Sequence, residues 1–162
     1  MTAMKLSGGC QCGAVRYHID GEVESPHLCH CRMCQKAAGN YFMPLAFVPG
    51  DGLKMTRGEP SWFQSSGPVR RGFCSNCGTP LFFDTLSSNG VAVTLGSLDD
   101  PAAIVPATND GVEARVPFHA ILDGLPATMT TRSDLPGGVA SIMSTNRQHP
   151  DHDTSDWPEG AK

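Results

Sequence analysis

The sequence predicts a mainly β fold, and three observations carry this prediction. Glycine (18) and proline (13) make up 31 of the 162 residues, a share that favours short strands and many turns over a helical bundle. Short β-prone segments recur along the first hundred residues, with turn signals between them. Only one helix is expected there, a short one over 32–38 that ends at Gly39.

The expected strands follow from alternation and from β-branched or aromatic composition. Residues 14–20 alternate apolar and polar side chains, the period of a strand, and Gly21 ends the segment. Pro44 has no amide hydrogen, so the strand over 41–48 is assigned to a sheet edge or to a bulge. The remaining strands are expected over 26–31, 53–56, 61–64, 69–73, 81–83 and 91–95.

The last third of the chain has a different character. Residues 99–103 are expected to form a single helical turn, and residues 112–122 either a strand pair or an irregular arm. From Ser144 onward the chain is polar and rich in Asp, which is typical of a tail with little tendency to order, although Trp157 offers an anchor. We therefore expect one domain over 1–143 and a polar tail over 144–162.

Charge and hydropathy exclude several classes of partner. The formal net charge is −4, and no segment is basic enough to predict a nucleic-acid-binding face. The longest apolar runs are too short to cross a bilayer, and residues 1–9 contain no apolar stretch typical of a signal peptide. We expect a cytoplasmic protein that binds neither nucleic acid nor membrane.

Seven cysteines in such a protein need a chemical explanation. An odd number cannot pair completely, and a reducing compartment would not keep disulfides. The cysteines fall into three tight groups: Cys10 and Cys12; Cys29, Cys31 and Cys34; and Cys74 and Cys77. Clustered cysteines in this setting indicate metal ligands.

The first and third groups are expected to form one structural zinc site. Such a site takes four tetrahedral ligands, so two cysteine pairs make one site. Gly13 and Gly78 each follow the second cysteine of a pair and allow the tight turn that aims backbone amides at the sulfurs. We therefore group Cys10, Cys12, Cys74 and Cys77. A redox-active C-x-x-C is the alternative, but the βαβ context typical of that motif is missing.

The middle group offers three cysteines, one fewer than a structural site requires. Three protein ligands and one open position are typical of a reactive zinc. The alternative is a closed site completed by histidine. His27 is the better candidate, because on a strand it shares a face with Cys29 and Cys31, whereas His30 points the other way.

Three thiolates restrict the chemistry of a zinc ion, because they leave the site with a formal charge of about −1. Such an ion activates water weakly and prefers a soft fourth ligand, such as an external thiolate. A thiolate bound there can add to an aldehyde carbonyl or leave from a thiohemiacetal. The cysteine pattern therefore favours carbon–sulfur bond chemistry over peptide or phosphate hydrolysis.

The motifs around these cysteines resemble a known family. The segments that carry the resemblance are Ser7–Tyr17, Cys29–Gly39, Arg71–Leu81 and Gly96–Pro101. They are similar to motifs of the glutathione-dependent formaldehyde-activating enzyme family, which also contains centromere protein V. The resemblance covers residues 4–101 and implies a β-tent fold of twisted antiparallel sheets.

The resemblance also implies a function and two zinc ions per chain. A structural zinc would lie on Cys10, Cys12, Cys74 and Cys77, and a second, reactive zinc on Cys29, Cys31 and Cys34. The implied activity is that of a carbon–sulfur lyase that acts on a thiol–aldehyde adduct, S-(hydroxymethyl)glutathione formed from glutathione and formaldehyde. The alternative is a non-enzymatic, zinc-stapled binding module. An exchangeable fourth ligand favours the enzyme, and a fixed His27 favours the module.

Other side chains are weaker candidates for a substrate site. Glutathione carries two carboxylates, and its candidate cations are Lys36, Arg70, Arg71 and Arg115, for each of which solvated surface charge is the preferred interpretation. His119 is a candidate acid or base near the second zinc, but its apolar surroundings favour a structural histidine. Candidate pocket aromatics are Phe42, Phe47, Trp62 and Phe82, for which core packing is preferred.

Overall fold

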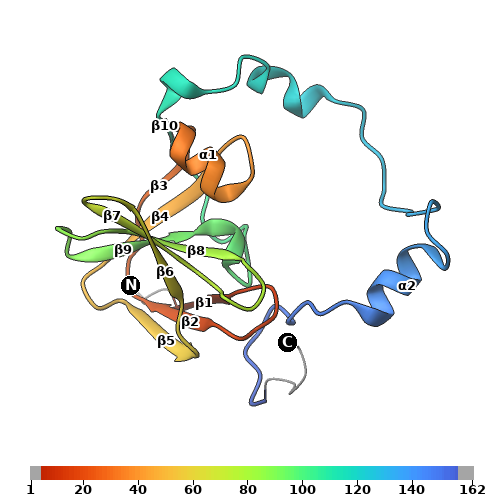
Figure 1. The fold of residues 1–162 in the computed structure, drawn as a ribbon, viewed down its shortest axis with the longest axis horizontal. Coiled ribbons are helices and arrows are strands. Elements are labelled where there is room, and N and C mark those ends of the chain that lie inside the picture. Colours follow the sequence, from red (N-terminus) through yellow and green to blue (C-terminus); the bar gives the residue numbers. More distant parts are fainter. Residues whose placement is uncertain (1–4, 157–162) are drawn as a thin grey trace.

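The computed structural model of the protein describes residues 5–156 and is mainly β, as the sequence predicts. A small sheet and a large sheet pack against each other, and one short helix, α1, covers an end of the large sheet (Figure 1). In the described chain, no helix is long and apolar enough to span a membrane.

The small sheet contains three antiparallel strands in the order β1-β2-β5. These strands are β1 (Lys5–Gly9), β2 (Arg16–Asp20) and β5 (Leu53–Arg57). The loop between β1 and β2 carries Cys10 and Cys12, so the first cysteine pair lies at one end of this sheet.

The large sheet contains seven strands in the order β10-β3-β4-β9-β8-β7-β6. Its strands are β3 (Glu24–Cys29), β4 (Met43–Pro49), β6 (Ser61–Ser66), β7 (Val69–Phe73), β8 (Pro80–Thr85), β9 (Gly90–Thr94) and β10 (Thr108–Asp110). Neighbouring strands are antiparallel except β10, which runs parallel to β3. Helix α1 (Arg32–Ala38) follows β3 directly.

The main core lies between the two sheets. Tyr17 and Ile19 of β2 are fully buried and pack in one cluster with Val48 of β4 and Val93 of β9. Because strand side chains alternate, Leu45 and Phe47 of β4 point to the opposite face of the large sheet. That second face carries a smaller core beside α1 and the cavity described below.

The assignment of Pro44 to an edge strand is wrong, and the bulge of the β3–β4 pairing lies on β3, between Glu24 and His27, not at Pro44. β4 lies between β3 and β9, in the interior of the large sheet. Pro44 lies opposite Leu28 of β3, and the pairing of β4 with β9 begins only at Leu45, so the missing amide hydrogen interrupts no bond of the ladder with β9.

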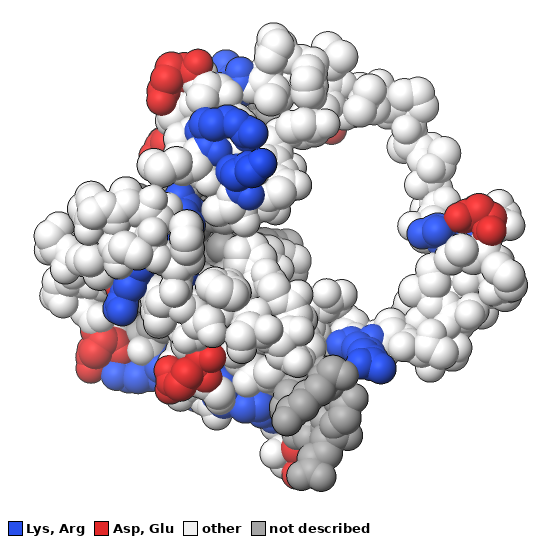
Figure 2. All heavy atoms as spheres, in the orientation of Figure 1, with Lys and Arg blue, Asp and Glu red and all other residues white. Residues whose placement is uncertain are grey.

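The chain beyond residue 110 leaves the sheets as a long arm, seen in Figure 1 as a wide loop that returns to the domain. Residues 112–122 form an irregular arm with the short 3₁₀ helices Val112–Ala114 and His119–Gly124, not a strand pair. Helix α2 (Gly138–Thr145) was not expected, and the predicted boundary at 143/144 falls inside it. The space-filling view shows an open gap between this arm and the domain (Figure 2).

After α2 the chain docks back onto the small sheet, which differs from the expectation of a tail with little order. His149 is buried, and its backbone N–H donates to the carbonyl of Gln11 at 2.7 Å. Asp153 accepts hydrogen bonds from Arg16 at 2.8 Å and pairs with His18 at 2.5 Å. The predicted anchor Trp157 lies outside the described residues.

Candidate metal centres

Four cysteines from two distant loops meet at one end of the small sheet. The Sγ atoms of Cys10, Cys12, Cys74 and Cys77 all lie within 4.8 Å of one another. Cys10 and Cys12 come from the β1–β2 loop, and Cys74 and Cys77 from the β7–β8 loop. The cluster therefore joins the two sheets through residues more than sixty positions apart.

The sulfur positions of this cluster fit a tetrahedral zinc ion. A Zn–S bond of about 2.3 Å requires sulfurs about 3.8 Å apart. The Cys10–Cys12 and Cys12–Cys74 sulfurs are 3.6 and 3.9 Å apart. Gly13 and Gly78 both adopt φ +78°, the left-handed conformation expected for the turns after each pair. The amide of Val15 donates to Cys10 Sγ at 3.2 Å, so backbone amides do face this cluster.

The surroundings of the four thiols differ. Burial raises the pKa of Cys10 well above its usual range. Burial also acts on Cys77, but hydrogen bonds from the side chains and the backbone of Thr79 and Cys12 outweigh it and lower the pKa of Cys77 to about 6. A thiol with so low a pKa is a thiolate at neutral pH and a ready metal ligand.

The second cluster is formed at the junction of β3 and α1. The Sγ atoms of Cys29, Cys31 and Cys34 lie within 4.8 Å of one another, and in residues 5–156 no further His, Cys, Asp or Glu ligand atom completes this group. Cys31 is the N-cap of α1, and its sulfur accepts the backbone N–H of Cys34 at 3.4 Å. Helix capping thus fixes two of the three sulfurs.

Arg71 is the neighbour of this cluster that sequence reasoning misplaced. It was expected to be surface charge, but it is buried at 8% exposure on β7. Its Nη2 donates to Cys34 Sγ at 3.4 Å. Burial raises the pKa of Cys34, and the Arg71 guanidinium acts against that rise. A buried cation beside three thiols offsets part of their negative charge when they bind a metal.

His27 is close to the cluster but outside the group of sulfurs. Its Nδ1 lies 2.7 Å from the carbonyl of Ser25, so Nδ1–H donates and Nε2 is left as the acceptor. Nε2 lies 3.9 Å from the carboxylate of Asp110. Ser25 has φ +47° and sits in a break of the β3–β4 register, between Glu24 and His27. This bulge sets the direction of the imidazole.

A cavity of about 400 Å³ opens onto the three sulfurs. Its floor is the outer face of the large sheet, with residues from β3, β4, β9, β8 and β7. His27, Arg71, Thr85 and Ser88 supply its polar groups apart from the thiols, and the remaining lining is apolar. The second cluster therefore faces a cavity, whereas three of the four cysteines of the first are buried.

A sequence profile described as glutathione-dependent formaldehyde-activating enzyme matches residues 5–113. The chain belongs to this family. The match includes all seven cysteines, both sheets and α1, and it ends where the arm begins.

Two curated relatives match the family domain. One is an uncharacterized lyase of Schizosaccharomyces pombe, 32% identical over 49% of this chain and 57% of its own length. The other is provisionally named glutathione-dependent formaldehyde-activating enzyme, in Halomonas elongata, and is 36% identical over 49% of this chain and 55% of its own length. The chain thus spans little more than half the length of these relatives.

A crystal structure of a Rhodobacter sphaeroides protein has a similar fold. The TM-score is 0.52 at 20% sequence identity, and the match covers 64% of this chain and 98% of the other. The likeness supports the family fold for the two sheets.

Most of the other candidate residues of this family member lie outside the cavity of the second cluster. His30 points away from the sulfurs, as expected, with Nε2 2.8 Å from Asn109 Oδ1. The ring of His119 packs edge-on against His30 at 4.8 Å and against Phe42 at 5.7 Å, behind the cluster and not in the cavity. His119 therefore belongs to the packing that supports β10 and α1.

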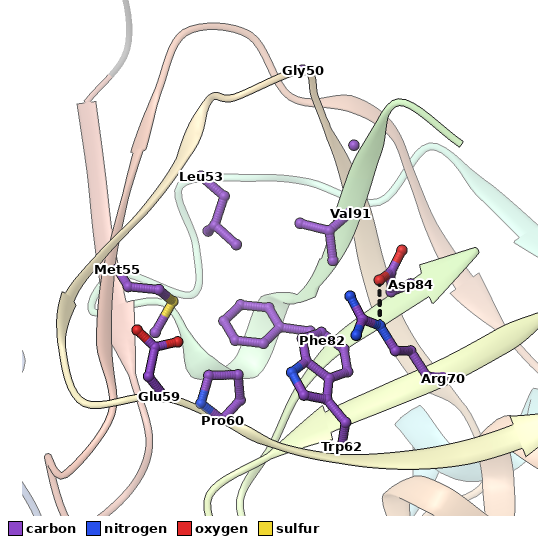
Figure 3. A pocket seen from close by; sticks show the side chains of 11 residues that line it. Gly50, Leu53, Met55, Glu59, Pro60, Trp62, Arg70, Phe82, Asp84 and Val91 are labelled. Atoms are coloured by element: carbon purple, nitrogen blue, oxygen red, sulfur yellow. Dashed lines mark hydrogen bonds and ion pairs between the residues drawn. The ribbon is translucent and has the colours of Figure 1, made fainter. Parts of the chain in front are cut away.

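Arg70 lines a different cavity, on the other face of the large sheet, toward β5. Its guanidinium lies 4.2 Å above the ring of Trp62 and pairs with Asp84 at 2.7 Å (Figure 3). Phe82 forms the base of this space, which has a volume of about 320 Å³. Of the four candidate aromatics, only Phe47 lines the cavity of the second cluster.

Lys36 lies with Arg32 in a third hollow on the outer side of α1. On the face drawn in Figure 2, positive and negative side chains form small separate groups, and neither sign forms an extended patch there.

Proposed function

We propose that this protein is a zinc-dependent carbon–sulfur lyase-type enzyme that acts on a thiol–aldehyde adduct at Cys29, Cys31 and Cys34. The observation that carries the proposal is the three-sulfur cluster facing a cavity, while the four-sulfur cluster lies enclosed at the joint of the sheets. We infer two zinc ions per chain, with a structural role for the ion at the four-cysteine cluster. The free thiols fit a reducing compartment such as the cytoplasm.

The donor set fits zinc and restricts what zinc does. A zinc ion held by these three thiolates would supply a soft position at which an external thiol binds as thiolate. The cysteines provide that position by their own geometry, because Cys31 caps α1 and Cys34 lies one turn later on the same helix. The helix thus holds two donors while β3 holds the third.

Arg71 sets the charge of this site. The formal charges of three thiolates and a divalent ion add up to about −1, and this negative charge disfavours a fourth anionic ligand. The guanidinium of Arg71, 3.4 Å from Cys34 Sγ and buried, brings the local sum close to neutral. Binding of an external thiolate is then easier, because the low-dielectric surroundings strengthen the attraction.

His27 is placed to accept the proton of the incoming thiol. Its Nδ1–H donates to the Ser25 carbonyl, so Nε2 is the basic nitrogen, and the ring lines the cavity. The Asp110 carboxylate, 3.9 Å from Nε2, would pair with the imidazolium. When the thiolate sulfur attacks the aldehyde carbon, the carbon–sulfur bond forms and the carbonyl oxygen gains that proton. In the reverse direction the hydroxyl loses the proton, the carbon–sulfur bond breaks, and the aldehyde and thiol separate.

Glutathione and formaldehyde are the reactants that the family name and the Halomonas elongata relative suggest. We propose them as the first thiol and aldehyde to test.

Cobalt substitution tests the proposal directly. Zinc-free protein reloaded with two equivalents of cobalt should show thiolate-to-cobalt absorption from both clusters. Addition of glutathione should change the absorption of one cluster only, and Cys34→Ser should abolish that change. If glutathione and small thiols leave the cobalt spectrum unchanged between about pH 6 and 9, the second cluster has no open coordination position. The binding-module function would then be favoured, and His27→Ala would show whether His27 closes the site.

A further inference from the structure

The cavity beside the three cysteines has an apolar floor that the register of the large sheet creates. Phe47 on β4 pairs with Ala92 on β9, Ala92 pairs with Phe83 on β8, and Phe83 pairs with Arg71 on β7. These cross-strand partners share one face of the sheet. Leu45, Val69 and Met33 complete the apolar wall around them.

The positive charge in this cavity already has partners within the protein. Arg71 is the one cation among the described lining residues. Its Nε donates to Ser65 Oγ at 3.1 Å, and its two Nη groups face Met43 Sδ and Cys34 Sγ at 3.7 and 3.4 Å. The guanidinium also lies 4.9 Å above the Phe83 ring. Three of the five N–H groups of Arg71 thus already face acceptors within the protein.

The cationic side chains of α1 line a different hollow from the cysteine cavity. Arg32 and Lys36 line the hollow on the outer side of the helix, and that hollow shares no lining residue with the cavity at the cysteines. A carboxylate inside the cysteine cavity would therefore lose its hydration while the one cation there already faces Cys34 Sγ, so its burial is costly. A hydrocarbon group would bury apolar surface against Phe47, Phe83 and Val69.

We propose that this cavity selects an adduct that carries an uncharged hydrocarbon group next to the sulfur. This inference rests on the proposed function, since it assumes that the adduct sulfur binds at the three cysteines. The apolar wall of this cavity of about 400 Å³ lies beside the three sulfurs, where such a group would be placed. The hydrocarbon group comes either from an aldehyde larger than formaldehyde or from an apolar thiol.

Calorimetric titration of the zinc-loaded protein distinguishes these sources. The first series is S-methyl-, S-butyl- and S-hexylglutathione, stable analogues of adducts between glutathione and longer aldehydes. The second series is ethanethiol, butanethiol and hexanethiol. In at least one series the affinity should rise about three- to fourfold per methylene until the cavity is filled. A terminal carboxylate, as in 6-mercaptohexanoate, should cancel the gain.

Variants connect the selectivity to the floor of the cavity. Val69→Thr keeps the shape but adds a hydroxyl, and should reduce the gain per methylene without affecting folding. Phe47→Ala should reduce it further. Phe63→Ala, an exposed aromatic on β6 outside this cavity, should behave like the parent protein.

The outcomes separate this inference from the proposed function. If glutathione alters the cobalt spectrum but neither series gains affinity with length, the hydrocarbon selectivity is wrong and the enzyme proposal stands. If carboxylate-terminated thiols bind as tightly as alkanethiols, the selectivity is also wrong. If no thiol alters the spectrum at all, the proposed function fails.

Discussion

The Nη2 atom of Arg71 lies 3.4 Å from the sulfur of Cys34, a contact that joins the middle of β7 to the first helix. Both side chains are buried, so the charge of the guanidinium acts on the thiol through a poorly screened medium. The relationship makes Arg71 a positioning and charge-balancing residue of the proposed reactive site.

Replacement of Arg71 by Met should weaken binding of an external thiol at the cobalt-substituted second cluster about tenfold or more, since a hydrogen bond to a charged group contributes about 1.5–3 kcal/mol. Arg71→Lys should restore part of the affinity, because the charge returns without the planar fork. Arg70→Met, which removes the neighbouring guanidinium from the other cavity, is the matched control. Equal thiol affinity in the parent and Arg71→Met proteins would exclude this role.

The two cysteine clusters should respond differently to loss of one ligand. Cys77→Ser removes a sulfur from the cluster that joins the sheets, and a structural zinc can contribute most of the folding free energy of a small domain. We expect a large drop in melting temperature for Cys77→Ser. Cys34→Ser should lose activity and thiol binding while it melts close to the parent protein. The reverse order of melting temperatures would mean that the roles of the clusters are exchanged.

Local signals in the sequence predicted the parts of the fold that depend on neighbouring residues. The helix over 32–38 has the limits that the sequence predicts, because Gly39, in the left-handed conformation at the C-cap, directly follows it. The N-cap Cys31 was not predicted. The positive φ of Gly13 and Gly78 followed equally from the cysteine pairs beside them.

Features set by strand register were not predictable in this way. Arg71 lies in the cavity because it pairs with Phe83 on β8, and nothing in its own neighbourhood signals that pairing. The strand β10 has three exposed residues and no hydrophobic pattern, and it exists only through its parallel pairing with β3. His149 could not be placed because its contacts are with Gln11 and Arg57, about 90 or more positions away.

The ion pair between Arg16 and Asp99 should be a major contributor to stability. Asp99 accepts both Nη groups of Arg16 at 2.6 Å and the hydroxyl of Ser7 at 2.5 Å. Breaking such a buried pair typically costs about 3–5 kcal/mol, so Asp99→Asn should lower the free energy of unfolding by about 3 kcal/mol. Asp134→Asn, which removes the partner of Arg132 in the exposed arm, should change little. Urea unfolding of both variants tests the difference.

The ion pair between Arg16 and Asp99 should also make the free energy of unfolding depend on pH in acid. Burial raises the pKa of Asp99, but the hydrogen bonds from Arg16 and Ser7 outweigh it, so the pKa is lowered in the folded state. The stabilisation by the Asp99 carboxylate is therefore fully present above its pKa in the unfolded chain, about 3.9, and is lost as the pH falls below that pKa. In Asp99→Asn the stability should depend less steeply on pH between about 4 and 2 than in the parent protein.

Docking of the returning segment around His149 should weaken in mild acid. The Nδ1–H of His149 donates to the Pro150 carbonyl at 2.7 Å, so Nε2 accepts from Arg57 Nη1 at 3.3 Å. This arrangement requires the neutral imidazole. Burial and the cations Arg16 and Arg57 lower the pKa of His149. Docking is therefore complete above the pKa of an undocked histidine, about 6.5, and is lost as the pH falls below that pKa.

Hydrogen exchange of the His149 amide measures this docking, because that N–H donates to Gln11. After correction for the intrinsic exchange rate, protection should fall between about pH 7 and 5. A His18→Gln background removes the other imidazole that contacts this segment, through Asp153. His149→Gln should abolish the pH dependence. Gly13→Ala should remove protection at every pH, because its Cβ would occupy the place of the His149 ring. Protection that stays constant from pH 7 to 5 in the parent protein would show that the charge of His149 does not control docking.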